Sequence, residues 1–162
     1  DILDRIKTTA QVVVDSADCA IGIDAGQLVP DEVIIDIVKE RLAMADCAGG
    51  YILDGFPRTL GQAVDLDEML ARRGEKVNAV ISIMIKDDTI KQRIQHRAEI
   101  EGRADDANEE TIKKRFAVYH NQTAPLIEWF KGQGVFQGFT YTDEIGLEGM
   151  VKNITEYVNT II

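Results

Sequence analysis

The chain has 162 residues, which suits one ordinary domain and is short for two independent ones. Hydrophobic residues make up 45% and charged residues 28%, which excludes general disorder, and the net charge of −10 disfavours a sequence-independent nucleic-acid binder. No apolar run reaches the ~18–20 residues of a membrane span, and two cysteines cannot build a disulfide scaffold, so we expect a cytoplasmic protein. Asp1 stands where an initiator Met would be expected, which predicts a longer gene product.

The first half of the chain alternates between strand-like and helical patterns. Residues 1–24 leave two interpretations open, because 12–14 are strand-like and 1–10 are more helical. Residues 31–45 predict a helix with an acidic first turn, and 51–53 a short buried strand that delivers Asp54 to a loop. Residues 59–73 predict a helix whose inward side chains are Leu60, Ala63, Val64, Met69 and Leu70.

The second half continues the alternation. Residues 77–85 are nearly all apolar and rich in β-branched side chains, which predicts a strand covered on both faces. A helix follows from Asp87, another spans 109–130, a third strand covers 135–141, and residues 147–161 form a closing amphipathic helix. Strands that alternate with helices predict an α/β fold with a parallel sheet flanked by helices.

Residues 86–115 concentrate the positive charge. They hold eight of the 18 basic residues, together with eight acidic ones. One interpretation is a site that attracts a small anion, and the other is a solvated helix pair with mixed ion pairs. Spacing alone favours the solvated helices. The basic residues are Lys86, Lys91, Arg93, Arg97, Arg103, Lys113, Lys114 and Arg115.

Residues 54–59 carry the best candidate for chemistry, because ligands of parallel sheets bind beyond the carboxyl ends of the strands. Asp54 could hold a water-ligated Mg²⁺, and Gly55 lets the backbone approach a ligand closely. Arg58 offers a planar fork for a phosphate, and Thr59 can cap the following helix. The alternative is a well-made turn whose arginine is merely exposed to solvent.

The stretch 50–59, Gly-Tyr-Ile-Leu-Asp-Gly-Phe-Pro-Arg-Thr, followed by Gln62 and Ala63, resembles the signature of adenylate kinases. Three further segments resemble parts of the same family and occur in the same order, at 24–33, 102–115 and 119–126. The resemblance is continuous from about Asp24 to the C-terminus, and it implies the α/β fold of the P-loop nucleoside monophosphate kinases.

The resemblance implies reversible phosphoryl transfer, in which Mg-ATP and AMP give two ADP, with Mg²⁺ entering on ATP. Arg58 would hold the AMP phosphate, Gln62 would hydrogen-bond the adenine, and Leu28 and Val29 would line the AMP pocket beside Gly55. The arginines that would close around the transferred group are Arg93, Arg97, Arg103 and Arg115. Asp54 and Asp106 would position the waters of the metal or orient those arginines.

The resemblance also implies how the chain is organised. Residues 1–162 would form a single α/β kinase domain, with 1–45 largely the AMP-binding region and about 97–106 a short lid. A lid of this length has no room for the four zinc ligands of some relatives, so we expect no zinc. The expected partners are ATP, AMP and ADP, and we expect a monomer that binds neither nucleic acid nor a membrane.

Two departures from the family set limits. The 162 residues contain no Gly-x-x-x-x-Gly-Lys-[Ser/Thr], so the first strand and the P-loop are absent from this chain, which predicts negligible kinase activity for the chain as written. Residues 4–23 also match poorly, since Asp4 stands where relatives carry an arginine and Arg5 follows one step later. The alternatives are a non-catalytic AMP-binding remnant and a kinase for UMP or CMP, although Gln62 favours adenine.

Four further residues have plain structural interpretations. We expect His96 to be exposed, His120 to be structural rather than a general base, and Cys47 to be a packing residue. Trp129, next to Phe130, should anchor the packing of its helix.

Overall fold

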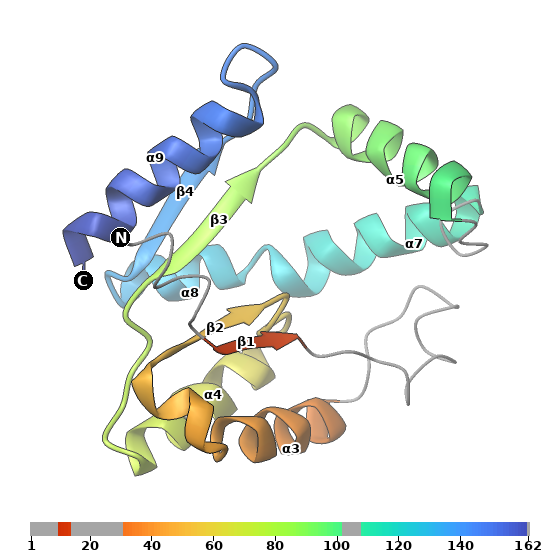
Figure 1. Cartoon of the computed structure of the whole chain (residues 1–162). Coiled ribbons are helices and arrows are strands. Elements are labelled where there is room, and N and C mark those ends of the chain that lie inside the picture. The colour runs from red at the N-terminus through yellow and green to blue at the C-terminus, as the bar shows by residue number, and fades with distance from the viewer. Residues whose placement is uncertain (1–9, 14–30, 102–107, 162) are drawn as a thin grey trace.

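The computed structural model describes residues 10–13, 31–101 and 108–161, arranged as four strands and a set of surrounding helices (Figure 1). The strands are β1 (Ala10–Val13), β2 (Tyr51–Asp54), β3 (Val80–Met84) and β4 (Phe136–Thr140). The helices are α3 (Asp31–Leu42), α4 (Leu60–Arg72), α5 (Asp87–Glu101), α7 (Glu109–Val118), α8 (Leu126–Gly132) and α9 (Gly146–Ile161). Two short elements complete the set, the 3-10 turn η2 (Ala45–Gly49) and the π-helical segment η3 (Tyr119–Thr123).

The strands pair in parallel. β1 pairs with β2 from Ala10↔Tyr51 to Val13↔Asp54, and β3 pairs with β4 from Val80↔Phe136 to Met84↔Thr140. The predicted α/β fold with parallel strands is therefore confirmed. In the part of the chain that the structure describes, the strands make two separate two-stranded sheets. β1 lies within residues 1–24, for which the sequence allowed either a strand or a helix.

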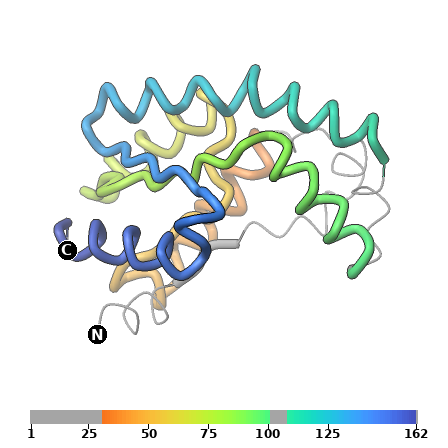
Figure 2. The backbone as a smooth tube through the Cα atoms, turned by 90° about the horizontal axis from the view of Figure 1, so that it is seen from above, coloured from red at the N-terminus to blue at the C-terminus, as the bar shows by residue number. Residues whose placement is uncertain are grey.

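Helices enclose each strand pair. Viewed from above, β3 and β4 lie between α8 on one side and α9 on the other (Figure 2). The rings of Phe139 on β4 and Tyr157 on α9 meet edge to face, with centroids 5.9 Å apart. α3 and α4 pack together beside the β1–β2 pair (Figure 1).

Most of the buried apolar residues that the structure describes form two clusters, and α4 contributes to both. The first cluster joins α3, β2 and α4, and its buried members are Ile34, Val38, Leu42, Cys47, Phe56, Leu66 and Leu70. The second joins α4 to α8, through Ala63, Leu126 and Phe130, and the first residues of β3 and β4, Val80 and Phe136, pack against it. Since α4 contributes to both clusters, it fixes the loop before it relative to both sheets.

The strand predicted over 77–85 is less covered than expected. Ile81 and Ile83 remain 38% and 49% exposed, so the expectation of cover on both faces is wrong. Ile83 is the register partner of Phe139 and thus shares the α9 side of the sheet, where α9 covers Phe139 and leaves Ile83 accessible. Ile52 on β2, expected to be buried, is likewise exposed.

The predicted helix over 59–73 is confirmed as α4, with Thr59 as its N-cap. Ala63 and Leu70 are buried as expected, whereas Leu60 and Val64 are exposed and Leu66 is buried instead. The buried positions 63, 66 and 70 repeat at a spacing of three and four, which forms a single stripe, and residues 60 and 64 lie beside it.

The helix predicted over 109–130 is interrupted. α7, η3 and α8 follow one another, and the N–H of Ala124 donates to the carbonyl of Tyr119 five residues earlier at 2.8 Å. Pro125 has no N–H, and its ring would clash with the carbonyl four residues before it in a regular α-helix. Local widening to a π-turn accommodates the proline and ends the regular α-helix at Val118.

The remaining structural expectations are mostly confirmed. Cys47 and Phe130 are buried, and His96 is exposed. Trp129 does not anchor the core, because α8 turns Phe130 inward and leaves the neighbouring indole 37% exposed. No helix within the described ranges is both long and apolar enough to cross a membrane.

Candidate functional site

The loop after β2 is held by its own backbone and by Arg58. Asp54 ends the strand, and Gly55 has a φ of +70°, in the left-handed region that favours glycine. The Nε of Arg58 donates to the carbonyl of Gly55 at 2.6 Å. The backbone angle therefore favours glycine, and a Cβ on Gly55, 2.8 Å from Nη2 of Arg58, would push the end of that side chain aside.

The backbone of Arg58 is fixed from two further directions. Its N–H donates to Oε1 of Gln62 at 2.7 Å, and its carbonyl accepts from the hydroxyl of Thr123 on η3 at 2.8 Å. Phe56, two residues earlier, is buried in the first core cluster and anchors the loop. Arg58 itself is exposed, so its guanidinium is accessible while its backbone is held by these hydrogen bonds. A planar cation held in this way suits a phosphate or carboxylate.

Gln62 lies directly beneath this loop. It is 2% exposed, and both ends of its amide are engaged: Oε1 accepts from Arg58 and Nε2 donates to Oδ1 of Asp31 at 2.7 Å. Thr59 caps α4 by accepting from the N–H of Gln62 at 3.1 Å, and its hydroxyl donates to Oδ2 of Asp31 at 2.9 Å. The predicted adenine contact is therefore a buried amide embedded in a hydrogen-bond network.

The arginines of α5 form a second group. Arg93 and Arg97 line a pocket of about 200 Å³ whose other walls are the apolar side chains Ile85, Ile90 and Ile94. The guanidinium carbon of Arg93 lies 4.4 Å from the ring centroid of Tyr141, just after β4. This geometry is a cation–π contact, and it holds Arg93 at the carboxyl end of the β3–β4 pair.

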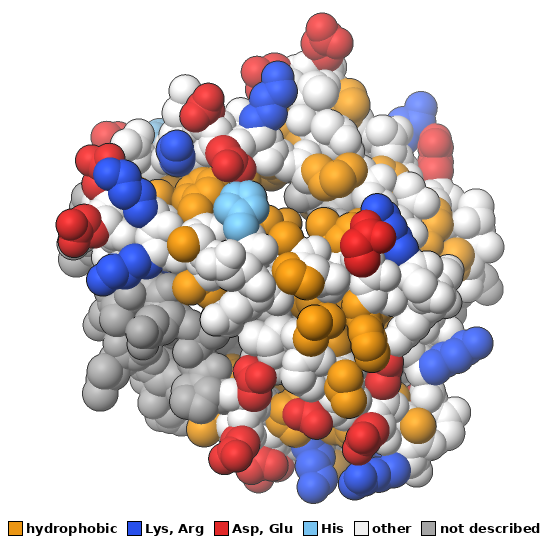
Figure 3. Space-filling model, turned by 180° about the vertical axis from the view of Figure 1, so that it is seen from behind, with side chains coloured by type: hydrophobic (Ala, Val, Ile, Leu, Met, Phe, Trp, Pro, Cys, Tyr) orange, Lys and Arg blue, Asp and Glu red, His pale blue; other side chains and the backbone are white. Residues whose placement is uncertain are grey.

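Other charges between 86 and 115 form ion pairs within their own helices. Lys91 lies 3.9 Å from Asp88, and Lys113 lies 2.9 Å from Glu109. The solvated-helix interpretation therefore holds for these lysines. Figure 3 shows the same mixing of basic and acidic side chains on one face of the molecule.

Arg115 is half-buried on α7 and makes contacts of its own. α5 and α7 also meet, since the ammonium of Lys91 lies 5.7 Å from the ring centroid of Phe116. His120 Nε2 lies 3.7 Å from Oδ2 of Asp87, which joins η3 to the start of α5 and agrees with a structural role.

Four predicted site residues lie outside the described residues, namely Leu28, Val29, Arg103 and Asp106. The structure brings Asp54, Gly55, Arg58 and Gln62 together in one loop and its supporting helix, and it places Arg93 and Arg97 on one pocket wall.

The sequence reasoning missed three supporting residues. Asp31 is predicted only as part of an acidic first turn within the family-like segment 24–33, and Thr123 only as part of a helix within the family-like segment 119–126. Tyr141 was assigned only to the end of a strand. The proline two residues after Thr123 was the available signal, because it marks an irregular turn at that point.

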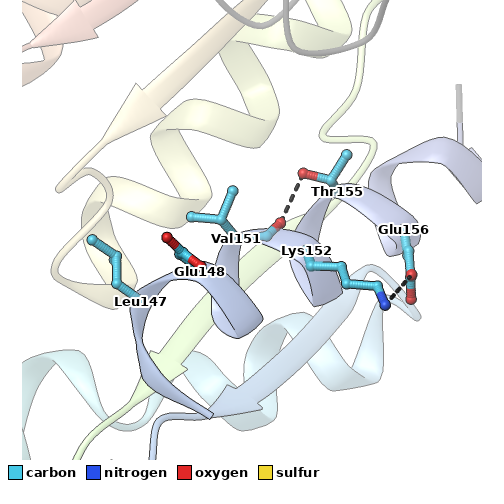
Figure 4. A pocket seen from close by; sticks show the side chains of 6 residues that line it. All are labelled: Leu147, Glu148, Val151, Lys152, Thr155 and Glu156. Atoms are coloured by element: carbon cyan, nitrogen blue, oxygen red, sulfur yellow. Dashed lines mark hydrogen bonds and ion pairs between the residues drawn. The ribbon is translucent and has the colours of Figure 1, made fainter.

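A larger depression, of about 490 Å³, lies elsewhere. It runs along α9, and the close view in Figure 4 shows Leu147 at one end of the lining and the Lys152–Glu156 ion pair, at 3.8 Å, toward the other. All of its lining residues belong to α9, so it shares none with the Arg58 loop.

The described residues hold no group of three or more His, Cys, Asp and Glu side chains placed to bind a metal. Asp54, exposed at the end of β2, places a carboxylate at the start of the loop. A Mg²⁺ carried by nucleotide phosphates keeps much of its water and needs only one or two protein carboxylates. The loop is thus compatible with an outer-sphere contact to such an ion.

Comparison with known proteins gives one consistent result. The adenylate kinase family profile matches residues 6–135. An adenylate kinase from Phocaeicola vulgatus is 50% identical over 115 residues, which cover 71% of this chain and 60% of that protein. One from Bacteroides thetaiotaomicron is 43% identical over 140 residues, 86% of this chain and 72% of the relative. One from Maricaulis maris is 50% identical over 111 residues, 68% of this chain and 58% of the relative. The matched part of the chain therefore spans between 58% and 72% of the length of these relatives.

Proposed function

This chain belongs to the adenylate kinase family, and we propose that it binds AMP at the Arg58 loop within a protein that transfers a phosphoryl group reversibly between Mg-ATP and AMP. One observation carries the proposal. Arg58 presents its guanidinium from a backbone fixed by Gln62 and Thr123, directly above a buried amide that can read a base. Arg58 can bind a phosphate and Gln62 can hydrogen-bond a base, and the two residues are four positions apart, which suits a nucleoside monophosphate.

In phosphoryl transfer the protein mainly positions the reactants and neutralises charge, and it does not need to form a covalent bond to them. In the proposed site the arginines of α5 and α7, Arg93, Arg97 and Arg115, surround the transferred phosphoryl group together with Arg103. Asp106 orients these arginines, and residues from about 97 to 106 act as the short lid. The cation–π contact of Arg93 supports this assignment, because it holds one of the arginines at the carboxyl end of the strands.

The proposed AMP pocket draws on the region 1–45. Leu28 and Val29 supply its apolar wall, Gly55 lets the backbone approach the nucleotide, and Arg58 and Gln62 bind the phosphate and the base. The support is the contact of Asp31, at the start of α3, with Gln62, which ties this region to the base-reading amide.

Asp54 is the proposed contact to Mg²⁺, through the metal's water shell. When bound, the ion would neutralise phosphate charge and orient the ATP phosphates. Asp54 itself would only accept hydrogen bonds from the metal's waters, which is the role its exposed carboxylate can fill without further ligands. No zinc takes part in this proposal.

The proposal includes a monomer in the cytoplasm that serves nucleotide biosynthesis with ATP, AMP and ADP as its partners. The buried thiol of Cys47, which forms no disulfide, supports only the reducing compartment. Size-exclusion chromatography with light scattering tests the monomer.

Calorimetric titration with AMP tests the site directly. Arg58→Lys keeps the charge and loses the planar fork, and we expect AMP to bind about tenfold more weakly or worse, since hydrogen bonds to charged groups contribute ~1.5–3 kcal/mol. Arg72→Lys is the matched control, because Arg72 is an exposed arginine on α4 whose partner is Glu68. Equal affinities for the two variants would refute the role of Arg58.

Turnover and base choice separate the alternatives. In a coupled assay with Mg-ATP and AMP, turnover well above background excludes the non-catalytic AMP-binding remnant. If UMP or CMP bound more tightly than AMP, the proposed substrate would be that nucleotide instead of AMP. We expect AMP to bind most tightly, because Gln62 offers both an amide N–H and an amide oxygen to a base.

A further inference from the structure

Asp31 makes two hydrogen bonds that cross from α3 to α4. Oδ1 accepts from Nε2 of Gln62 at 2.7 Å, and Oδ2 accepts from the hydroxyl of Thr59 at 2.9 Å. The two partners are three residues apart at the start of α4, so one carboxylate holds both the helix cap and the buried amide. The negative charge also lies where the dipole of α4 favours an anion.

These bonds determine which way the Gln62 amide faces. An ionised carboxylate can only accept a hydrogen bond, and the backbone N–H of Arg58 can only donate one. Asp31 therefore requires the nitrogen end of the amide, and Arg58 requires its oxygen end. Reversing the amide would set oxygen against oxygen and N–H against N–H, and it would break both hydrogen bonds of a side chain that is 2% exposed.

The donor and the acceptor of the Gln62 amide that stay unused are then fixed in position as well. A glutamine amide has two N–H donors and two acceptor lone pairs, and Asp31 and Arg58 use one of each. One N–H and one lone pair remain, in a fixed order along the group. Adenine presents a ring-nitrogen acceptor beside an amino donor, whereas the corresponding edge of guanine presents a ring N–H beside a carbonyl oxygen. A fixed amide can discriminate between these patterns, and a freely rotating amide cannot.

Gly61 makes the close approach of Asp31 possible. A Cβ on Gly61 would lie 3.0 Å from Oδ2 of Asp31, which is closer than ordinary van der Waals contact. The glycine in the first turn of α4 thus leaves room for the carboxylate, although glycine is costly inside helices.

We propose that Asp31 is a positioning residue that locks the orientation of the Gln62 amide and thereby makes the site select adenine. The base-selecting part rests on the proposed AMP site. The orienting part rests only on the contacts among Asp31, Thr59, Gln62 and Arg58.

The orienting part is tested by NMR on the chain without nucleotide. The side-chain amide signals of Gln62 are assigned by their disappearance in Gln62→Glu. Asp31→Asn removes the acceptor-only group while keeping its shape, and we expect the Gln62 amide protons to exchange with solvent on the order of tenfold faster. The matched control is Asp36→Asn, the same substitution at an exposed position of α3. Unchanged exchange in Asp31→Asn, with an intact circular dichroism spectrum, would overturn the proposal.

Gly61→Ala gives a second, independent perturbation. It leaves all four polar partners in place and displaces the carboxylate by crowding Oδ2, so we expect it to speed the same exchange. If Asp31→Asn proves unfolded, this variant decides the orienting part alone: unchanged exchange overturns it.

The base-selecting part is tested by titrating AMP and GMP into the wild type, Asp31→Asn and Asp36→Asn. We expect Asp31→Asn to reduce the preference for AMP over GMP by about fivefold, and Asp36→Asn to leave it unchanged. Equal weakening of both nucleotides would show a merely structural role and overturn this part. A wild type that binds no AMP would refute the proposed function and the base selection together, whereas the exchange measurement would still decide whether Asp31 orients Gln62.

Discussion

Tyr51, a half-buried residue at the start of β2, contributes to the stability of the fold through its hydroxyl group. Its hydroxyl donates to Oε2 of Glu75 at 2.9 Å, just beyond the end of α4. Burial raises the pKa of Tyr51 above its ordinary value of 10.0, and the hydrogen bond to the Glu75 carboxylate raises it further. The folded protein therefore holds this proton more tightly than the unfolded chain does.

The raised pKa of Tyr51 makes the protein less stable at high pH. Below pH 10 the tyrosine is protonated in both states, so its contribution to stability is fully present. Above pH 10 the unfolded chain loses the proton first, and the free energy of unfolding falls by up to about 1.4 kcal/mol per pH unit. Tyr51→Phe lacks this proton, so we expect it to be ~1 kcal/mol less stable than wild type at pH 7 and to overtake wild type above pH 11.

Urea denaturation of both proteins from pH 7 to 12 measures the difference. Lysines and the other tyrosines titrate in both proteins alike, so their effects cancel in the comparison. A constant gap between the two curves across this range would contradict the role of Tyr51.

At the level of elements, the π-turn of η3 aims Thr123 at the functional loop. Its hydroxyl donates to the carbonyl of Arg58, 65 residues away in sequence, at 2.8 Å. Thr123→Val removes this bond without changing the shape of the side chain. We expect it to cost ~1 kcal/mol of unfolding free energy and to weaken AMP binding about two- to fivefold, because the Arg58 backbone loses one of its supports.

Thr155→Val is the matched control for this prediction. The hydroxyl of Thr155 also donates to a backbone carbonyl, that of Val151 at 2.7 Å, but within the single helix α9 (Figure 4). Such a bond back to the preceding turn adds little stability. Thermal unfolding and calorimetry should therefore leave Thr155→Val close to wild type, and equal losses in both variants would rule out a special role for Thr123.

The elements also show what the sequence could and could not predict. Periodicity identified α4 almost to the residue, because Thr59 supplies a cap signal and Gly74 a stop signal. It placed Leu60 and Val64 inside and missed Leu66, because apolar spacing admits two adjacent stripes and only the neighbouring elements decide between them. Arg58 is predicted from its place after a strand and Gln62 from the resemblance, whereas the contacts of Asp31 and Thr123 join residues 28 and 65 positions apart, and local sequence patterns do not record such contacts.

At the level of the whole molecule, the alternation of strands and helices correctly predicted parallel pairing, but not that the described strands form two pairs. Pairing partners depend on which strand edges meet, and apolar runs such as 80–84 carry no record of their neighbours. The prediction of cover on both faces fails at Ile81 and Ile83 for the same reason, since an apolar run indicates a strand but does not determine which elements cover it.

The two core clusters should nevertheless unfold as one unit, because α4 belongs to both. Leu66 is 1% exposed in the first cluster, and Trp129, the single tryptophan, lies on α8 next to the Phe130 of the second. We expect Leu66→Ala to lower the free energy of unfolding by ~2–5 kcal/mol. The same loss should appear in Trp129 fluorescence and in far-ultraviolet circular dichroism, since loss of α4 packing in one cluster removes Ala63 from the other.

Leu147→Ala, at a position 73% exposed on α9, should change stability by less than about 0.5 kcal/mol. If Leu66→Ala shifts the dichroism transition and leaves the fluorescence transition in place, the two halves unfold independently, and α4 does not couple them.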